Sequence, residues 1–259
     1  MSTLTIAAVQ TNIQWLDKAK NLANLAERLD SIKSADLIVL PETFSTGFGM
    51  DDEAIQEPQQ SGMVYEWMQQ QSIKHNAVIA GSVFVEDAGR KRNRFYWIYP
   101  NGETYFYDKR HLFRLGHEEQ YVNPGTSREV FEINQIRILP QVCYDLRFPV
   151  WSRNRQDYDV MVNVANWPIM RRDAWDTLLK ARAMENQVFV VGVNRVGLDG
   201  KNVDHSGGTA IYDFLGRAIV SAEDNQQQII QMTIDIDELK AFRQSYPMLK
   251  DADDFEIKI

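Results

Sequence analysis

The segment ILPQVCYDLRFP, residues 138–149, is the most informative stretch of this chain. An apolar run leads into Cys143, and polar and charged residues follow it at once. This order predicts a buried strand that ends in a tight turn, with the thiol at the carboxyl end of the strand. In a sheet covered on both faces, ligands bind beyond those ends. A lone cysteine also often serves as a small core residue, so the segment by itself leaves both interpretations open.

The composition is typical of an ordinary soluble protein, with 44% hydrophobic and 25% charged residues. The net charge of −8 argues against a general nucleic-acid binder, which needs a basic face. The single cysteine permits no internal disulfide, which indicates a reducing cytoplasm. The apolar run at the N-terminus ends at Gln10 and lacks a basic flank, so we expect neither a signal peptide nor a membrane span.

Short apolar runs alternate with helical patterns along the chain, which predicts an α/β or mixed fold with two sheets. We find no repeat, linker or low-complexity segment, and we expect one domain over residues 1–259. A hairpin is expected around Asn101-Gly102 and another around Asn134-Gln135. The expected strands are 4–10, 37–40, 77–85, 94–99, 103–108, 130–142 as a pair, 159–164, 188–193, 209–214, 218–222 and 229–234. The expected helices are 22–32, around 64–68, 173–187 and 237–243.

Two further reactive side chains stand at the ends of predicted strands. Glu42 follows the apolar run 37–40, and Lys109 follows the second strand of the Asn-Gly hairpin. Side chains at the carboxyl edge of a sheet are placed where sites form. Each of them would otherwise be read as an ordinary solvated residue. Together with Cys143 they make a carboxylate, an ammonium and a thiol at three strand ends.

Five motifs in chain order resemble the nitrilase superfamily of carbon-nitrogen hydrolases. They are PET at 41–43, KRHLF at 109–113, CYDLRFP at 143–149, NWP at 166–168 and ARAMENQ at 181–187. Each motif is weak alone, but all five in this order are specific, and they extend from the first strand to about Phe214. The resemblance implies a four-layer α-β-β-α sandwich, a single carbon-nitrogen hydrolase domain and a homodimer packed through a helical layer.

The resemblance also implies a role for each reactive residue. Glu42 corresponds to the general base, Lys109 to the oxyanion stabiliser and proton donor, and Cys143 to the nucleophile. The family often has a second glutamate that orients the lysine and precedes a Pro-Gly turn. Counting back from that turn makes Glu118 the match, with Glu119 as its rival.

The residue types fit amide hydrolysis without the resemblance. A thiol with a pKa of ~8.5 is mostly protonated at neutral pH, so it needs a base to attack an amide carbon. Glu42 would take the proton, and Lys109 with the backbone N–H of Tyr144 would hold the oxyanion. Ammonia leaves, and water activated by Glu42 hydrolyses the thioester. This sequence of steps requires no metal and no organic cofactor.

Within the superfamily the chain resembles the omega-amidase branch, which implies a small 2-oxo acid amide such as 2-oxoglutaramate or 2-oxosuccinamate as substrate. The carboxylate of such a substrate calls for a cation in the pocket. Arg147, Arg171 and Arg172 are the nearest in sequence, and Arg147, four residues after the nucleophile, is favoured over the other two. Each would otherwise form a structural ion pair. Three aromatic residues are expected either to wall a narrow slot or to pack in the core: Phe44, Tyr107 and Trp167.

Other functions fit the sequence less well. A papain-like Cys/His enzyme is disfavoured, because none of the four histidines, His75, His111, His117 and His205, lies in a cysteine-protease signature. No metal-ligand spacing, GxGxxG or Walker motif is present. A deaminated-glutathione amidase, another amidase of the superfamily, and a binding or scaffold protein without activity remain as alternatives.

Overall fold

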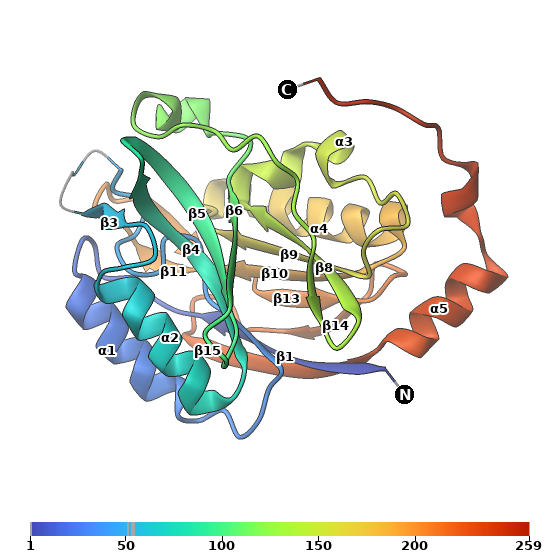
Figure 1. Ribbon diagram of the computed structural model, residues 1–259, viewed down its shortest axis with the longest axis horizontal. Helices are drawn as coiled ribbons and strands as arrows, with labels where there is room; N and C mark the ends of the chain where they lie inside the picture. Colours follow the sequence, from blue (N-terminus) through green and yellow to red (C-terminus); the bar gives the residue numbers. More distant parts are fainter. Residues whose placement is uncertain (1, 51, 53–54, 259) are drawn as a thin grey trace.

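Two β-sheets face each other at the centre of the computed structural model, which describes residues 2–50, 52 and 55–258 (Figure 1). The first sheet has the order β15-β1-β2-β4-β5-β6, and β3 pairs with β4. Its strands are β1 (Thr3–Gln10), β2 (Leu37–Val39), β3 (Glu57–Pro58), β4 (Val78–Asp87), β5 (Arg90–Ile98), β6 (Thr104–Asp108) and β15 (Gln228–Asp235).

The second sheet has the order β14-β13-β10-β9-β8-β7. Its strands are β7 (Phe131–Ile133), β8 (Ile136–Val142), β9 (Val160–Ala165), β10 (Phe189–Asn194), β13 (Ala210–Tyr212) and β14 (Ala218–Ser221). A separate hairpin consists of β11 (Val196–Leu198) and β12 (Asp204–Ser206).

Helices cover the outer faces of both sheets. The helices α1 (Lys18–Leu29) and α2 (Met63–His75) pack on the first sheet, and α4 (Arg172–Asn186) packs on the second (Figure 1). The short α3 (Pro149–Ser152) follows the Cys143 turn, and α5 (Ile236–Ser245) lies near the C-terminus. The layers therefore run α-β-β-α, which confirms the predicted fold. No helix in the described ranges is long and apolar enough to cross a membrane.

Each central strand is apolar on both sides because each sheet is buried on both faces. In β1, Ile6 faces the core between the sheets, whereas the next residue, Ala7, faces the helices. In β9, Val162 faces the same inter-sheet core, and Met161 packs toward α4. Successive side chains of a strand point to opposite faces, so a continuous apolar run satisfies both layers at once. Burial of each large side chain contributes roughly 1.5–3 kcal/mol.

The parallel strands end at the positions that carry the reactive residues. The strands β1, β2 and β4 are parallel neighbours, and so are β8, β9 and β10. Glu42 follows β2, Cys143 follows β8, and the motif beginning at Asn166 follows β9. Lys109 follows β6, the second strand of the antiparallel hairpin. The three strand ends predicted to carry the site are therefore present.

The main differences from the prediction concern short elements. The strands β3, β11 and β12 have two or three residues each and were not predicted. Helix α1 ends at Leu29, so Ile32, expected in the helix, lies beyond it although its side chain is buried. The hairpin turn expected at Asn134-Gln135 is confirmed, and both of its residues have the positive φ that a two-residue turn favours.

Candidate active site

One ammonium and two carboxylates, far apart in the sequence, are hydrogen-bonded together in the interior. The Nζ atom of Lys109 donates to Oε1 of Glu42 at 2.9 Å and to Oε2 of Glu118 at 2.9 Å. No more than 1% of any of the three residues is exposed. Glu119, the rival candidate, is exposed on the surface. The geometry therefore assigns the second buried carboxylate to Glu118.

Two asparagines complete the hydrogen bonds of Glu42. The Nδ2 atom of Asn93 donates to Glu42 Oε1 at 2.9 Å and to Glu118 Oε1 at 3.2 Å. The backbone N–H of Asn166 donates to Glu42 Oε2 at 2.8 Å. Both oxygens of Glu42 are thus held in fixed directions. Asn93 lies inside β5 and was not predicted as a site residue, and Asn166 entered only as part of a motif.

The charges in this cluster determine its protonation. Burial alone would lower the pKa of Lys109, but the charges of Glu118 and Glu42 outweigh burial and hold that pKa well above its ordinary value. Burial raises the pKa of Glu118, and the charge of Lys109 offsets this rise only in part. Lys109 therefore stays an ammonium at neutral pH.

Cys143 lies at a strained turn beside this cluster. It is the first residue of the 3₁₀ helix η4 (Cys143–Arg147) and has φ = 48°, which is unusual for any residue other than glycine. Burial and the charge of Glu42 raise the pKa of the Cys143 thiol well above its ordinary value, and the charge of Lys109 offsets this only in part. The thiol is therefore protonated at neutral pH and needs a base to react.

A buried carboxylate holds the Cys143 turn in place. Asp145 accepts hydrogen bonds from the backbone N–H of Val142 at 3.0 Å, from that of His111 at 2.9 Å and from the hydroxyl of Tyr107 at 2.8 Å. The Tyr107 hydroxyl also accepts from the indole of Trp151 at 3.0 Å. Tyr107 therefore supports the turn from behind and does not line the cavity. Of the two places expected for it, it takes the one in the core, where its hydroxyl serves Asp145.

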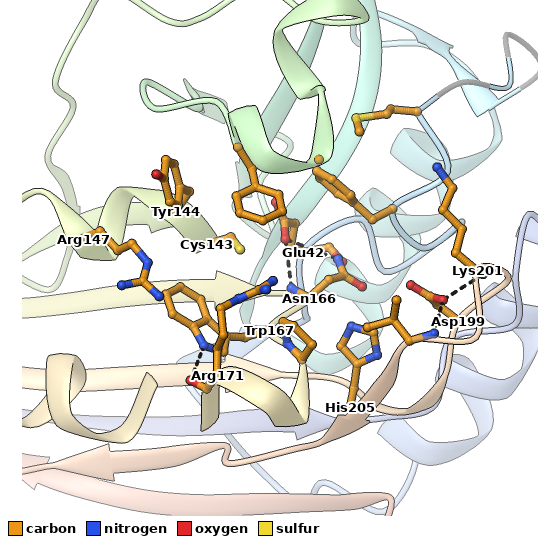
Figure 2. A pocket seen from close by; sticks show the side chains of 16 residues that line it. Glu42, Cys143, Tyr144, Arg147, Asn166, Trp167, Arg171, Asp199, Lys201 and His205 are labelled. Atoms are coloured by element: carbon orange, nitrogen blue, oxygen red, sulfur yellow. Dashed lines mark hydrogen bonds between the residues drawn. The ribbon is translucent and has the colours of Figure 1, made fainter. Parts of the chain in front are cut away.

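The thiol opens into a cavity of about 170 Å³ (Figure 2). Glu42 and Asn166 lie along the cavity beside Cys143. Trp167 forms part of the cavity wall, one of the two places expected for it. Phe44 does not reach the cavity. Its fully buried ring packs among the residues under the outer helices, 5.9 Å from the ring of Trp67.

Two of the three candidate arginines line the cavity. The guanidinium of Arg147 lies 4.9 Å from the ring centroid of Trp167, and that of Arg171 lies 5.2 Å from the ring centroid of Phe113. Within the part of the chain that the structure describes, neither is paired with a carboxylate. Arg172 instead pairs with Asp176 and Asp224 and does not line the cavity.

Tyr144 contributes both a side chain and a backbone N–H to the site. Its ring lines the cavity and packs edge-on against Phe113, with 5.3 Å between the ring centroids. It is the second residue of η4, and the first N–H groups of a helix have no partner within the helix. The N–H next to the thiol is thus in a suitable place to bind an oxyanion.

A family model described as carbon-nitrogen hydrolase matches residues 5–244. The chain belongs to the carbon-nitrogen hydrolase family. It is 44% identical to the Omega-amidase YafV of Yersinia enterocolitica, over 98% of this chain and 99% of that protein. It is 32% identical to a 2-oxoglutaramate amidase of Bacillus subtilis, over 95% and 96% of the two chains.

The fold comparison agrees with this family. The structure of XC1258 from Xanthomonas campestris, described as a CN-hydrolase superfamily protein with an arsenic adduct in the active site, matches with a TM-score of 0.96. The two chains are 40% identical, and the match covers 100% of each. The family predicted from the five motifs, the sandwich fold and the class of enzyme, a hydrolase of carbon–nitrogen bonds, are confirmed. The comparisons do not favour the scaffold alternative.

Proposed function

We propose that this carbon-nitrogen hydrolase is an omega-amidase that converts the terminal amide of a short 2-oxo dicarboxylic acid monoamide to the acid and ammonia. Its substrates are 2-oxoglutaramate and 2-oxosuccinamate. Two full-length relatives carry the names omega-amidase and 2-oxoglutaramate amidase. The observation that carries the proposal is a thiol beside a buried carboxylate–ammonium pair, in a cavity that also holds two guanidiniums. Among the residues that the structure describes, neither guanidinium has a carboxylate partner.

The first step is attack of the Cys143 sulfur on the amide carbon. Because the pKa of the thiol is raised, free thiolate is scarce at neutral pH, and Glu42 takes the proton as the C–S bond forms. The hydrogen bonds that Asn166 and Lys109 donate fix the carboxylate for this transfer. Because the carboxylate is already held in the reactive position, no rearrangement of the site adds to the activation barrier of the attack.

The second step is collapse of the tetrahedral intermediate. The ammonium of Lys109 and the N–H of Tyr144 stabilise the oxyanion. The proton on Glu42 passes to the leaving nitrogen, the C–N bond breaks, and ammonia departs. Water, deprotonated by Glu42, then adds to the thioester, the C–S bond breaks, and the thiol regains its proton. No proton remains unaccounted for, and Glu42 acts as both base and acid.

Glu118 acts by positioning Lys109, and its substitution tests that role. Glu118→Gln should lower kcat by about 10- to 100-fold with little change in KM, because it removes a charge-assisted hydrogen bond worth roughly 1.5–3 kcal/mol. Steady-state ammonia release measures both constants. Glu119→Gln is the matched control, since Glu119 is exposed and should change neither. Equal kcat in both variants would rule out the positioning role.

The two cavity guanidiniums, Arg147 and Arg171, bind the carboxylate of the substrate. Arg147→Met and Arg171→Met should each raise KM for 2-oxoglutaramate by about tenfold or more, because each removes a charged hydrogen-bond donor. The rate with a small uncharged aliphatic amide should stay within about threefold of wild type. Arg217→Met, at an exposed position in the turn between β13 and β14, is the control. A fall in rate that is the same for charged and uncharged amides would contradict the assignment.

The substrate class is tested by ammonia release with a panel of amides and related compounds. The panel contains 2-oxoglutaramate, 2-oxosuccinamate, a nitrile and an N-carbamoyl amino acid, and hydrolysis of deaminated glutathione is followed through its amine product. The short 2-oxo amides should have the highest kcat/KM. A clear preference for the nitrile or the carbamoyl compound would overturn the proposal.

The proposal includes the assembly of the protein. We expect a homodimer of single-domain subunits, residues 1–259, in the cytoplasm. The support for a dimer is the carbon-nitrogen hydrolase family to which the chain belongs. Light scattering coupled to gel filtration should give the mass of two chains, and a monomer at micromolar concentration would contradict the dimer.

A further inference from the structure

A small hairpin forms one part of the cavity wall. The residues that it contributes have no role in the proposed reaction. This β11–β12 hairpin, residues 196–206, brings Asp199, Lys201, Val203 and His205 to the cavity. Figure 2 shows three of them, Asp199, Lys201 and His205, on the far side of Glu42 from Cys143. None of these four residues was predicted as a site residue, because the strands are too short to give a periodic signal.

The loop of the hairpin has a fixed shape. The Oδ1 atom of Asp199 accepts the backbone N–H of Lys201 at 2.8 Å and that of Val203 at 2.9 Å. The backbone N–H of Asp199 donates to the carbonyl of Val203 at 3.0 Å. The carboxylate of Asp199 is therefore used inside the loop, where it holds the wall in shape.

The hairpin also packs closely on the indole of Trp15, behind the cavity lining. At Gly200, a Cβ atom would lie 2.4 Å from ring atoms of Trp15, so only glycine fits there. The same indole packs against residues 47–50, the segment that brings Phe48 and Met50 to the cavity. The hairpin and this segment thus both pack on the Trp15 ring.

Arg195 fixes the base of the hairpin. Its side chain is fully buried, and Nη2 donates to the carbonyls of Ile13 and Leu198, at 3.1 Å each. Burial lowers the pKa of Arg195 to about 10, so the guanidinium is still charged at neutral pH. Its Nη1 atom has no hydrogen-bond partner among the described residues. Burying a cation held mainly by carbonyl groups is costly, and here it ties the hairpin to Ile13.

The direction of the substrate follows from the proposed chemistry, on which this inference rests. Glu42 gives its proton to the leaving nitrogen, so that nitrogen lies on the Glu42 side of the thiol. The carboxylate of the substrate lies toward Arg147, the favoured one of the two cavity arginines, which Figure 2 shows on the opposite side of Cys143 from Glu42. Any group attached to the amide nitrogen would therefore extend toward the hairpin.

The geometry points to the β11–β12 hairpin, held by Arg195, as the element that restricts the enzyme to primary amides. The leaving group that fits between Glu42 and the hairpin is ammonia, and amides with a substituent on the nitrogen, such as N-alkyl 2-oxoglutaramates or deaminated glutathione, are excluded by contact with Val203 and His205. Burial and the charge of Arg195 lower the pKa of His205 to about 4, so this wall presents a neutral imidazole at working pH.

The test compares kcat/KM for 2-oxoglutaramate and its N-methyl and N-propyl amides, followed by release of 2-oxoglutarate. In wild type, kcat/KM for the primary amide should exceed that for either N-alkyl amide by at least about tenfold. A hydrophobic wall discriminates against added carbon atoms by about this factor. Arg195→Met should lower that preference by about tenfold, with kcat/KM for the primary amide within about threefold of wild type. An unchanged preference in a folded Arg195→Met variant would overturn the inference.

A second variant keeps the inference testable if Arg195→Met does not fold. His205→Ala removes a wall side chain directly and should lower the preference in the same way. Leu198→Ala is the matched control, because Leu198 lies on the same hairpin, is 60% exposed and does not line the cavity. Failure of wild type to hydrolyse 2-oxoglutaramate would overturn the proposed function. Normal turnover of 2-oxoglutaramate with equal turnover of the N-propyl amide would overturn only the role of the hairpin.

Discussion

Replacing Cys143 with Ala should lower kcat for 2-oxoglutaramate by about 10⁴-fold or more. The chain contains one cysteine, so no second thiol can form the thioester. The substitution removes a single sulfur atom from a half-buried side chain beside the cavity, and the midpoint of thermal unfolding should stay within a few degrees of wild type. Steady-state ammonia release and a thermal melt measure the two effects separately.

Cys143→Ser is a more conservative substitution that tests whether the sulfur itself is required. The hydroxyl has almost the shape of the thiol, but it is a weaker nucleophile under the same base, so its rate should also be strongly reduced. In wild type, rapid acid quenching during turnover should trap an acyl group on the peptide that contains Cys143, detected by mass spectrometry. A rate of about a hundredth of wild type in Cys143→Ala would place the nucleophile elsewhere.

The three residues that the sequence placed at strand ends share one property. Glu42, Lys109 and Cys143 come directly after strands with a strong apolar or aromatic pattern, so local periodicity alone places them at sheet edges. The choice of Glu118 over Glu119 depended on counting from a turn. The 3₁₀ helix η3 (Glu118–Gln120) points the first of its two acids inward and leaves the second in solvent.

The direction in which individual side chains point was less predictable from the sequence. Phe44 was expected either to wall the slot or to pack in the core, and it packs in the core. Between Glu42 and Phe44, Thr43 has φ = 44°, which turns the chain and sends the Phe44 ring under the outer helices. No composition or spacing rule identifies a β-branched residue in that conformation. Asn93 was missed because one polar residue in an amphipathic strand looks like any solvent-facing position.

The cavity wall could not be predicted because its strands are short and its contacts join distant parts of the chain. The strands β11 and β12 have three residues each, and the pairing that matters joins residues 195–198 to residues 11–13, far away in the chain. Contacts between residues so far apart in the sequence depend on how the two sheets pack, so only the folded structure reveals them. The same is true of Arg195, which the sequence shows as an unremarkable arginine after a buried strand.

Replacing Lys109 with Met should reduce both activity and stability. The variant removes the ammonium that bridges Glu42 and Glu118 and leaves two fully buried carboxylates without a counter-charge. Removal of one partner from a buried ion pair typically costs 3–5 kcal/mol, so the free energy of unfolding should fall by about that amount. The loss of an oxyanion donor and of the orientation of Glu42 should together lower kcat by about 10³-fold or more.

The pH dependence separates this effect from a simple loss of packing. In Lys109→Met the pKa of Glu118 rises further above that of the unfolded chain, because the charge that opposed the effect of burial is gone. The folded state then binds more protons than the unfolded state, so the variant regains stability as the pH falls toward that raised pKa. Denaturant unfolding at several pH values measures the slope. Lys74→Met is the control, because Lys74 pairs with Asp30 on the surface, where a pair is worth about 1 kcal/mol or less.

Adding Glu118→Gln to Lys109→Met distinguishes the electrostatic explanation from the alternatives. The double variant carries one buried carboxylate in place of two, so it should recover a large part of the lost stability at neutral pH. It should recover none of the activity, because neither the oxyanion donor nor the alignment of Glu42 returns. If the double variant were as unstable as Lys109→Met, packing around the lysine stem would be the cause. If it regained activity, Lys109 would have no role in stabilising the oxyanion.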